Sequence, residues 1–267
     1  MIYNFDFRKS LGQNFLIDDS VVDNIANAID YKENNMIIEI GPGSGNLTKK
    51  LLKKADFVLL YEIDTRLKKI LSRELLEFNN YDIIWDDFLY RDVKEDLKKY
   101  NYKNIYIVAN LPYYITTPIV SKFVMETIPA NEIVIMIQKE VAERIAASPG
   151  SKTYGILSVF LQAFYHIEYL FTVGEKVFDP PPKVKSAVIR LTRNERVELG
   201  CEEKLFFNVV KTGFNQRRKT LRNSIRGIIP PGFDSPYLNL RPEQLGITDF
   251  LQLCQDIEKN RNIGDKA

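Results

Sequence analysis

The arrangement of apolar residues over the first 190 positions limits this chain to a small set of folds. Short β-branched or aromatic runs, each about as long as a strand, alternate with stretches whose apolar residues recur every three or four positions. The strand-like runs are 36–40, 57–63, 81–85, 105–109 and 132–137, then 165–173 and 186–192, and the helical stretches are 47–55, 65–77, 118–127 and 141–164. Strands that alternate with helices predict a parallel, doubly wound α/β sheet.

The last part of the chain follows a different pattern. No clear helix separates the runs 165–173 and 186–192, only a proline-rich segment, so we expect these strands to form an antiparallel pair at the edge of the sheet. After residue 192 the strand pattern ends, and 202–214, 217–228 and 242–259 are predicted helices. We therefore expect an α/β domain over residues 1–193 and a small C-terminal α-helical domain over 194–267.

The first predicted strand runs into a glycine-rich turn that opens a helix, in the sequence EIGPGSGN at residues 39–46. Glycine at Gly41, Gly43 and Gly45 allows the backbone to turn tightly and approach a ligand, with the first amides of the helix facing it. The dinucleotide-binding pattern G-x-G-x-x-G requires glycine where Asn46 stands. The turn therefore favours a nucleoside ligand over a pyrophosphate.

Carboxylates follow the next two strands. The second strand ends in Glu62 and Asp64, at a spacing from the glycine turn where an acid can accept hydrogen bonds from both hydroxyls of a ribose. The third ends in Asp86 and Asp87, followed by Phe88, where a carboxylate can accept a hydrogen bond from an adenine amino group. Each feature alone is common, but this order and spacing predict an S-adenosyl-L-methionine site in preference to an NAD site.

The sequence NLPYY, residues 110–114, lies at the carboxyl end of the fourth strand, where doubly wound sheets bind their ligands. This sequence is similar to the Asn/Asp-Pro-Pro-Tyr motifs of enzymes that methylate exocyclic amines. The side-chain oxygen of Asn110 and the carbonyl of Leu111 could accept hydrogen bonds from adenine N6 and stabilise the positive charge that develops there. Pro112 would stiffen the turn and Tyr113 would stack on the base. The methylated ammonium can lose its proton to water, so the reaction needs no histidine base.

Beyond these motifs, the sequence resembles one family over nearly its whole length, the KsgA-type ribosomal RNA adenine dimethyltransferases of the small subunit. The resemblance rests on LGQNFL (11–16), QKEVAER (138–144), KTYGILSV (152–159), FDPPPKV (178–184) and FNQRRKTLRNS (214–224). It implies a class I, Rossmann-like, S-adenosyl-L-methionine-dependent methyltransferase sheet. It also implies the transfer of two methyl groups to N6 of each of two adjacent adenosines near the 3′ end of 16S rRNA, within the small ribosomal subunit or its precursor, and a role in ribosome biogenesis.

The same resemblance assigns roles to individual residues. Contact with the methyl donor is implied for Asn14, Leu16, Gly41, Glu62, Asp87 and Asn110, and Gly43 of the glycine turn joins this cofactor-binding set. Contact with the target adenine is implied for Asn110, Leu111, Tyr113 and Phe178. Alignment with the family favours Asp87 over Asp86 as the acid that meets the donor's adenine. Because Phe178 would pack against the face of the base opposite Tyr113, the adenine must leave its stack to enter.

Charge is unevenly distributed along the chain. There are 37 Lys and Arg against 35 Asp and Glu overall, a net charge of +2, yet residues 183–226 hold 12 basic and 4 acidic side chains. Such a segment is expected to meet an anionic partner. Within it, Arg218, Arg222 and Arg226 recur every four positions, which predicts a basic helical face beside Arg217 that contacts RNA phosphates.

The composition argues against several other chemistries. A single histidine, His166, makes a Ser-His or Cys-His pair and a histidine-based metal site improbable. Cys201 and Cys254 form no C-x-x-C pair and are expected to be idle thiols in a reducing compartment. We therefore expect no metal. The apolar runs are only strand-length and the start lacks an apolar leader, so we expect a cytoplasmic protein without a membrane partner.

Two alternatives share these motifs. One is an adenine N6-methyltransferase of 23S rRNA that confers macrolide resistance, whose catalytic motifs would look much the same. The other is a ribosome assembly factor that keeps the methyltransferase fold without catalysis. The RRKTLRN sequence at 217–223 favours the small-subunit enzyme over the first, and the intact glycine turn and NLPY sequence argue against the second as the only role.

Overall fold

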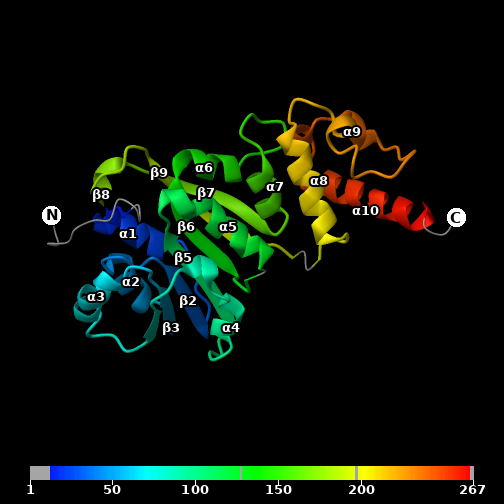
Figure 1. Cartoon of the computed structure of the whole chain (residues 1–267). Helices are drawn as coiled ribbons and strands as arrows, with labels where there is room; N and C mark the ends of the chain where they lie inside the picture. The colour runs from blue at the N-terminus through cyan, green and yellow to red at the C-terminus, as the bar shows by residue number, and fades with distance from the viewer. Residues whose placement is uncertain (1–12, 127, 196–197, 265–267) are drawn as a thin grey trace. The chain divides into compact units, whose positions relative to one another are not determined.

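The computed structural model describes residues 13–126, 128–195 and 198–264 (Figure 1). The chain divides into two compact units, one made of the residues up to Ala142 with His166–Arg193, the other of Glu143–Tyr165 with the residues from Asn194 onward. The first unit is α/β and the second is α-helical. Residues Glu143–Tyr165, which precede the predicted domain boundary at 193, thus pack within the helical unit.

The α/β unit is built on a sheet whose strand order, among the described residues, is β4-β3-β2-β5-β6-β9-β7. Five strands run parallel to one another: β2 (Asn35–Ile40), β3 (Phe57–Tyr61), β4 (Tyr81–Ile84), β5 (Asn104–Asn110) and β6 (Glu132–Gln138). Strand β9 (Ser186–Arg193) is antiparallel to β6, and β7 (Tyr165–Val173) lies outside it. The predicted Rossmann-like sheet, with the last two strands at its edge, is confirmed.

Helices cover both faces of this sheet (Figure 1). On one face lie α1 (Asp19–Ala26), α2 (Asn46–Leu52) and α3 (Lys68–Glu74), which bury Val22, Leu51 and Leu71 in one cluster with Ile37 and Val58 of the strands. The short α4 (Val93–Leu97) and the longer α5 (Thr116–Met125) belong to the other side. Coverage of both faces explains why β2 is buried along its whole length and why its sequence is apolar except for Asn35 at its start and Glu39.

A separate two-stranded ladder joins distant parts of the chain. Strand β1 (Phe15–Leu16) pairs antiparallel with β8 (Phe178–Asp179), in the register Phe15 to Asp179 and Leu16 to Phe178. The amide of Ile17 extends the ladder by donating to the carbonyl of Val177 at 2.9 Å. This ladder was not among the sequence predictions, and Leu11 and Gly12 of the LGQNFL motif lie outside the described residues.

The helical unit contains α7 (Ile156–Gln162), α8 (Glu203–Asn215), α9 (Leu221–Ser224) and α10 (Ile247–Gly264). The boundary between the two units in the sequence falls after Ala142, within the short α6 (Lys139–Ile145). The predicted helix over 141–164 is interrupted between α6 and α7 by a loop that contains Pro149 and Gly150. Aromatic rings fill the core of the unit, with Phe160 and Phe207 edge to face at 4.7 Å and Phe206 and Phe250 fully buried.

The predicted helix over 217–228 is wrong for most of its length. Only α9, Leu221–Ser224, is helical, because Thr220 has an extended backbone at ψ 158° and Ile225 leaves the helical region at the other end. Arg218, Arg222 and Arg226 are all exposed, but Arg222 alone lies on the helix. They do not form a stripe on one helical face. Within the described residues no helix combines the length and apolar character needed to cross a bilayer.

Candidate active site

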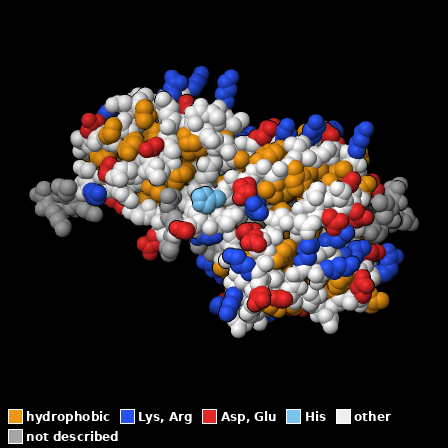
Figure 2. Space-filling model, turned by 180° about the vertical axis from the view of Figure 1, so that it is seen from behind, with side chains coloured by type: hydrophobic (Ala, Val, Ile, Leu, Met, Phe, Trp, Pro, Cys, Tyr) orange, Lys and Arg blue, Asp and Glu red, His pale blue; other side chains and the backbone are white. Residues whose placement is uncertain are grey.

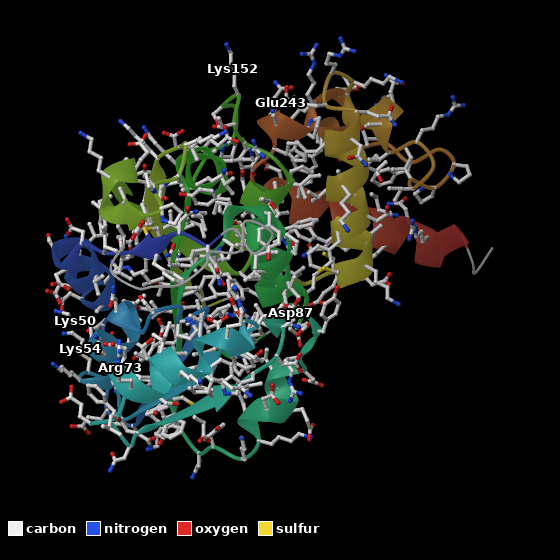
Figure 3. The ribbon with its side chains drawn as sticks, turned by 60° about the vertical axis from the view of Figure 1, so that its left-hand side comes forward. Lys50, Lys54, Arg73, Asp87, Lys152 and Glu243 are labelled. Atoms are coloured by element: carbon white, nitrogen blue, oxygen red, sulfur yellow. The ribbon has the colours of Figure 1, made fainter. Side chains whose placement is uncertain are left out.

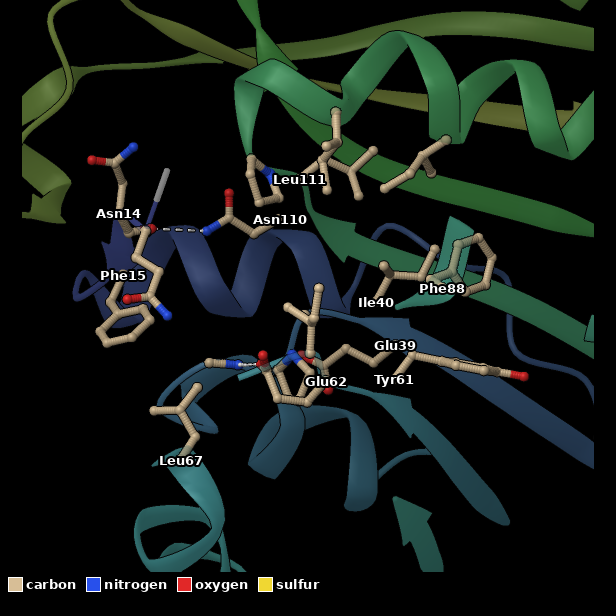
Figure 4. A pocket seen from close by; sticks show the side chains of 18 of the residues that line it. Asn14, Phe15, Glu39, Ile40, Tyr61, Glu62, Leu67, Phe88, Asn110 and Leu111 are labelled. Carbon is tan, nitrogen blue, oxygen red and sulfur yellow. Dashed lines mark hydrogen bonds between the residues drawn. The ribbon is translucent and has the colours of Figure 1, made fainter. Parts of the chain in front are cut away.

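A cavity of about 310 Å³ opens in the α/β unit where β2, β3, β4 and β5 end (Figure 4). Its walls contain every residue that the sequence assigned to the donor, to the target adenine or to catalysis. These residues are Asn14, Leu16, Gly41, Gly43, Glu62, Asp87, Asn110, Leu111, Pro112, Tyr113 and Phe178. They come together because the carboxyl ends of parallel strands meet at one edge of the sheet, and because the β1–β8 ladder brings in both its strands.

The glycine turn forms the floor of this cavity. Gly41, Gly43 and Gly45 have φ of 72°, 57° and 83°, in the left-handed region that favours glycine. A Cβ added at Gly43 would stand 3.0 Å from Cε1 of Phe15, so the backbone of the turn and this ring are in close contact. Asn46, at the start of α2, donates to the carbonyl of Leu16 at 2.9 Å and ties the turn to β1.

The two acids after β3 have different environments. Buried Glu62 accepts hydrogen bonds from the amide of Gly43 at 3.2 Å and from the amide of Asp64 at 2.8 Å, and burial raises the pKa of its carboxyl (Figure 4). Asp64 instead accepts from the Arg66 guanidinium and from Gln13, which lowers its pKa to about 2. Glu62 lines the cavity, whereas Asp64 is engaged by its own neighbours.

A third acid, Glu39, was passed over in the sequence. It lies within β2 rather than after it, is 1% exposed, and contributes to the cavity wall. Its Oε2 has no hydrogen-bond partner, and burial, assisted by the charge of Glu62, raises the pKa of this carboxyl to about 8. A charged residue inside an otherwise apolar strand was the available signal, because buried carboxyls with shifted pKa values gather at functional sites.

The loop after β4 is held by its own side chains. Asp87 Oδ1 accepts from the amide of Leu89 at 2.9 Å and caps the 3₁₀ turn Phe88–Tyr90, so its Oδ2 is the oxygen available to a ligand. Phe88 is buried edge-on against Tyr61, at 5.1 Å between ring centroids. Asp86 accepts from the amide of Asp87 and pairs with Arg91 at the surface of the loop.

A buried lysine of α5 holds this loop by hydrogen bonds to its backbone. Lys122 is 7% exposed and donates to the carbonyls of Arg91 at 2.8 Å and Leu89 at 3.3 Å, and to Glu126 at 2.6 Å. Its ammonium also lies 5.7 Å from the centre of the Phe88 ring. Lys122 therefore joins the loop that carries Asp87 to the helix that follows the NLPYY sequence. Nothing in the sequence pattern distinguishes it from other lysines.

The NLPYY sequence forms a rigid turn. Asn110 donates from Nδ2 to the carbonyl of Asn14 at 3.2 Å, which leaves Oδ1 as the acceptor of its side chain (Figure 4). Leu111 is buried, and its amide donates to the carbonyl of Met136 at 3.1 Å. The Tyr113 hydroxyl and Ser186 Oγ are 2.7 Å apart, which anchors the ring between the turn and β9.

The charge of the cavity indicates what it binds. Among its described lining residues there is no Lys or Arg, and the ionisable acids are Glu39, Glu62, Asp86 and Asp87. A phosphate-bearing dinucleotide would meet only like charge here, whereas a sulfonium and an ammonium would be attracted. The donor set thus fits S-adenosyl-L-methionine, whose ribose hydroxyls and adenine amino group need acceptors of this kind. No group of three or more described His, Cys, Asp or Glu is placed to hold a metal ion.

Sheet topology and cavity chemistry together define a methyltransferase that uses S-adenosyl-L-methionine as its cofactor. A family model described as Ribosomal RNA adenine dimethylase matches residues 4–246, and the chain belongs to this family.

Individual relatives agree with the family. The chain is 48% identical over 258 residues to the Ribosomal RNA small subunit methyltransferase A of Parabacteroides distasonis, covering 95% of this chain and 94% of that protein. It is 49% identical to the protein of the same name from Bacteroides thetaiotaomicron, covering 94% of each. Among solved structures, a dimethyladenosine transferase from Plasmodium falciparum matches with a TM-score of 0.79 at 26% identity, covering 91% of this chain and 97% of that one. The 23S rRNA methyltransferase ErmE matches with a TM-score of 0.67 at 26% identity, covering 92% of this chain and 100% of that one.

The three candidate arginines belong to the helical unit, and the structure places them differently. Arg217 donates to the carbonyls of Lys152 at 2.7 Å and Ser151 at 3.0 Å, so its guanidinium is used internally, while the side chain of Lys152 points away from the unit (Figure 3). Arg222 pairs with the exposed Asp234 at 2.6 Å, and Arg218 is exposed. Figure 2 shows Lys and Arg side chains projecting as a group from one edge of the molecular surface.

Proposed function

We propose that this enzyme dimethylates N6 of two adjacent adenosines in the 3′-terminal hairpin of 16S rRNA, in the small ribosomal subunit or its precursor. It would act in the cytoplasm and contribute to small-subunit biogenesis. The observation that carries this proposal is the geometry of Asn110, whose amide nitrogen is held by the Asn14 carbonyl so that Oδ1 is free to accept from an amine. The names and coverage of the relatives that are 48–49% identical support the small subunit as the substrate.

The chain's residues would activate the target amine by hydrogen bonding. S-adenosyl-L-methionine supplies an electrophilic methyl group, and adenine N6 is a poor nucleophile because its lone pair is delocalised into the ring. Asn110 Oδ1 and the carbonyl of Leu111 would accept from the two N–H groups, draw the nitrogen toward tetrahedral geometry and stabilise its developing charge. Tyr113, anchored by Ser186, and Phe178 of β8 would enclose the two faces of the flipped base.

The donor would lie along the ends of β2, β3 and β4. Glu62 would accept from the ribose hydroxyls, and Asp87 Oδ2 from the adenine amino group, with Phe88 packed nearby. Gly41 and Gly43 would allow close approach of the donor, and Asn14 and Leu16 would cover it from β1. The carboxylates of Glu62, Asp86 and Asp87 would offset the donor's two positive groups, whereas Glu39, with its pKa raised to about 8, would be mostly protonated near neutral pH.

RNA backbone contacts would come from the helical unit. We propose residues 194–267 as an RNA-binding accessory domain in which the exposed Arg218 and Arg222 meet phosphates. Arg217, assigned to the same role from the sequence, would act indirectly by holding the Ser151–Lys152 loop through its two carbonyl contacts. Lys152, which projects from this loop, would extend the basic surface (Figure 3).

The alternative functions have less support. The 23S rRNA enzyme ErmE is 26% identical to this chain, whereas the small-subunit enzymes are 48–49% identical at similar coverage. A purely structural assembly factor would not require an Asn110 amide held in a productive orientation. We therefore retain the small-subunit dimethyltransferase as the proposal.

The decisive experiment uses small subunits isolated from cells that lack this modification. We expect purified protein with labelled donor to produce dimethyladenosine in 16S rRNA, detected by mass spectrometry. Asn110→Ala should lower turnover by about 10²–10³, as loss of one such electrostatic contact does elsewhere, with RNA binding retained. Asn101→Ala, an exposed asparagine outside the cavity, is the matched control. Wild-type turnover by Asn110→Ala, or 16S rRNA that stays without dimethyladenosine although the protein is folded, would refute the proposal.

The phosphate contacts need their own test. Replacing Arg218 and Arg222 together by alanine should weaken binding of small subunits and reduce the dependence of the affinity on salt, because fewer counterions are released. The double variant Lys53→Ala with Lys69→Ala removes the same charge from two exposed positions of the α/β unit, the C-cap of α2 and helix α3. Equal losses of salt dependence in the two double variants would mean that the arginines act only through net charge.

A further inference from the structure

Two large aromatic side chains stand exposed at the rim of the cavity. Tyr90 is 86% exposed and Tyr114 is 56% exposed, and both belong to the cavity lining. They come from different loops, Tyr90 from the turn after β4 and Tyr114 from the turn after β5. Most other large aromatics of the described α/β unit are at least half-buried, so this exposed aromatic rim marks a contact surface.

Both rings stand on supports that the protein fixes in place. Tyr90 ends the 3₁₀ turn that Asp87 caps and Lys122 holds through the Leu89 carbonyl. Tyr114 follows Tyr113, whose hydroxyl is anchored to Ser186. Tyr90, Tyr114 and Asp87 all line the same cavity. The two tyrosines therefore border one opening and are not independent surface residues.

The charge around this opening determines what kind of contact it can make. No Lys or Arg is among the described residues that line the cavity, and Asp86 at the loop surface has a side chain that is 51% exposed. A phosphate drawn toward this rim would meet the carboxylates of Asp86 and Asp87, because the neighbouring Arg91 is already paired with Asp86 and Asp96. A nucleobase has no charge, and its flat face can stack on a tyrosine ring whatever its identity. Aromatic stacking is also the usual way in which proteins hold bases of single-stranded RNA.

We propose that Tyr90 and Tyr114 are stacking platforms for the unpaired RNA bases next to the adenosine in the pocket. The inference rests on the proposed function, because a substrate with two adjacent target adenosines leaves one outside whenever the other is inside. The two tyrosine rings stack on the face of the neighbouring base, while the helical unit binds the phosphates of the RNA backbone. Recognition of the RNA is thus divided between an uncharged contact and a charged one.

The two contacts have different salt dependence, and this separates them. The variants are Tyr90→Ala, Tyr114→Ala and the corresponding phenylalanine substitutions, assayed with unmethylated small subunits. We expect each alanine variant to raise KM for small subunits about tenfold, and each phenylalanine variant to stay within twofold of wild type, since the ring is kept. The slope of affinity against salt should not change in either series, unlike in the arginine variants.

Two further measurements complete the test. Affinity for S-adenosyl-L-homocysteine, measured by calorimetry, should stay within twofold of wild type in all four variants. Leu76→Ala, which truncates an 84% exposed side chain that does not line the cavity, is the matched control and should leave every parameter unchanged.

The outcomes that overturn the inference are distinct. Alanine variants with wild-type KM would show that the rim does not touch RNA, and a matching loss of S-adenosyl-L-homocysteine affinity would assign the rings to the donor. A reduced salt slope would assign them to phosphate binding. Failure of the proposed function would appear separately, as absence of dimethyladenosine with the wild-type protein.

Discussion

Replacement of Lys122 by methionine tests how the loop after β4, which carries Asp87, is held in place. Methionine has nearly the same length and volume, so the change removes the charge and the hydrogen bonds without opening a large cavity. The carbonyls of Leu89 and Arg91 lose a charged donor, at 3.3 and 2.8 Å, while Glu126 is 43% exposed on its side chain and regains water. Stability should fall and the loop should lose its anchor.

The size of the effect follows from these contacts. Hydrogen bonds to a charged group contribute about 1.5–3 kcal/mol each, but removal of a buried ammonium also relieves its desolvation cost. We expect a net loss of about 2 kcal/mol in the free energy of unfolding. If the loop bears most of it, the affinity for S-adenosyl-L-homocysteine falls about tenfold to thirtyfold, at about 1.4 kcal/mol per factor of ten.

The assay compares two ligands by calorimetry. S-adenosyl-L-homocysteine carries the adenine amino group that Asp87 is expected to accept from, and S-inosyl-L-homocysteine lacks it. Wild type should prefer the first, and Lys122→Met should lose much of that preference, an effect that general destabilisation does not produce. Lys98→Met, at an exposed position paired with Glu95, is the control. Unchanged preference with a lowered melting temperature would refute the reasoning and leave Lys122 a purely structural role.

The remaining predictions concern the floor and wall of the cavity. Glu39→Gln should flatten the pH dependence of stability. The pKa of Glu39 is raised from 4.5 to about 8 in the folded state, so the wild type loses stability as pH rises between these values, whereas the variant does not. Urea unfolding from pH 5 to 8 measures the difference. An equal pH slope in both proteins would contradict this. Gly43→Ala should lower stability by about 1–2 kcal/mol because of its φ of 57°, and should also weaken donor binding through displacement of Phe15. Gly150→Ala has the same kind of strain at φ 85° with open space around the Cβ, so equal donor affinities in the two variants would exclude the Phe15 contact as a cause.

The sheet could be predicted from the sequence because its signal is local. Each buried strand is a continuous apolar run, and the observed strands differ from the predicted ones by only a few residues at their ends. The cavity followed from the same pattern, because glycines and acids after parallel strands converge wherever the strands do. The predicted location of the cavity residues was therefore based on the expected sheet, in which these residues follow parallel strands.

Features that depend on distant contacts were missed. The β1–β8 ladder joins two-residue strands about 160 positions apart, too short for any periodicity to appear. The predicted helix over 217–228 is interrupted because Thr220 is extended and Ile225 leaves the helical region, and the Arg217 guanidinium is bound to the carbonyls of the distant Ser151–Lys152 loop. Lys122 is one lysine among many until the fold buries it under the loop after β4.

The β1–β8 ladder has a thermodynamic consequence. Leu16 of one strand and Phe178 of the other both line the cavity and are partners in the ladder. In the proposed function, Leu16 would contact the donor and Phe178 the target base. If the donor orders this ladder when it binds, the RNA binds to a ladder that is already ordered, so the free energy of RNA binding becomes more favourable. By reciprocity, RNA would then raise the affinity for the donor by the same factor. Two substrates that both order this ladder would bind cooperatively, and a substitution in either strand would change the binding of both.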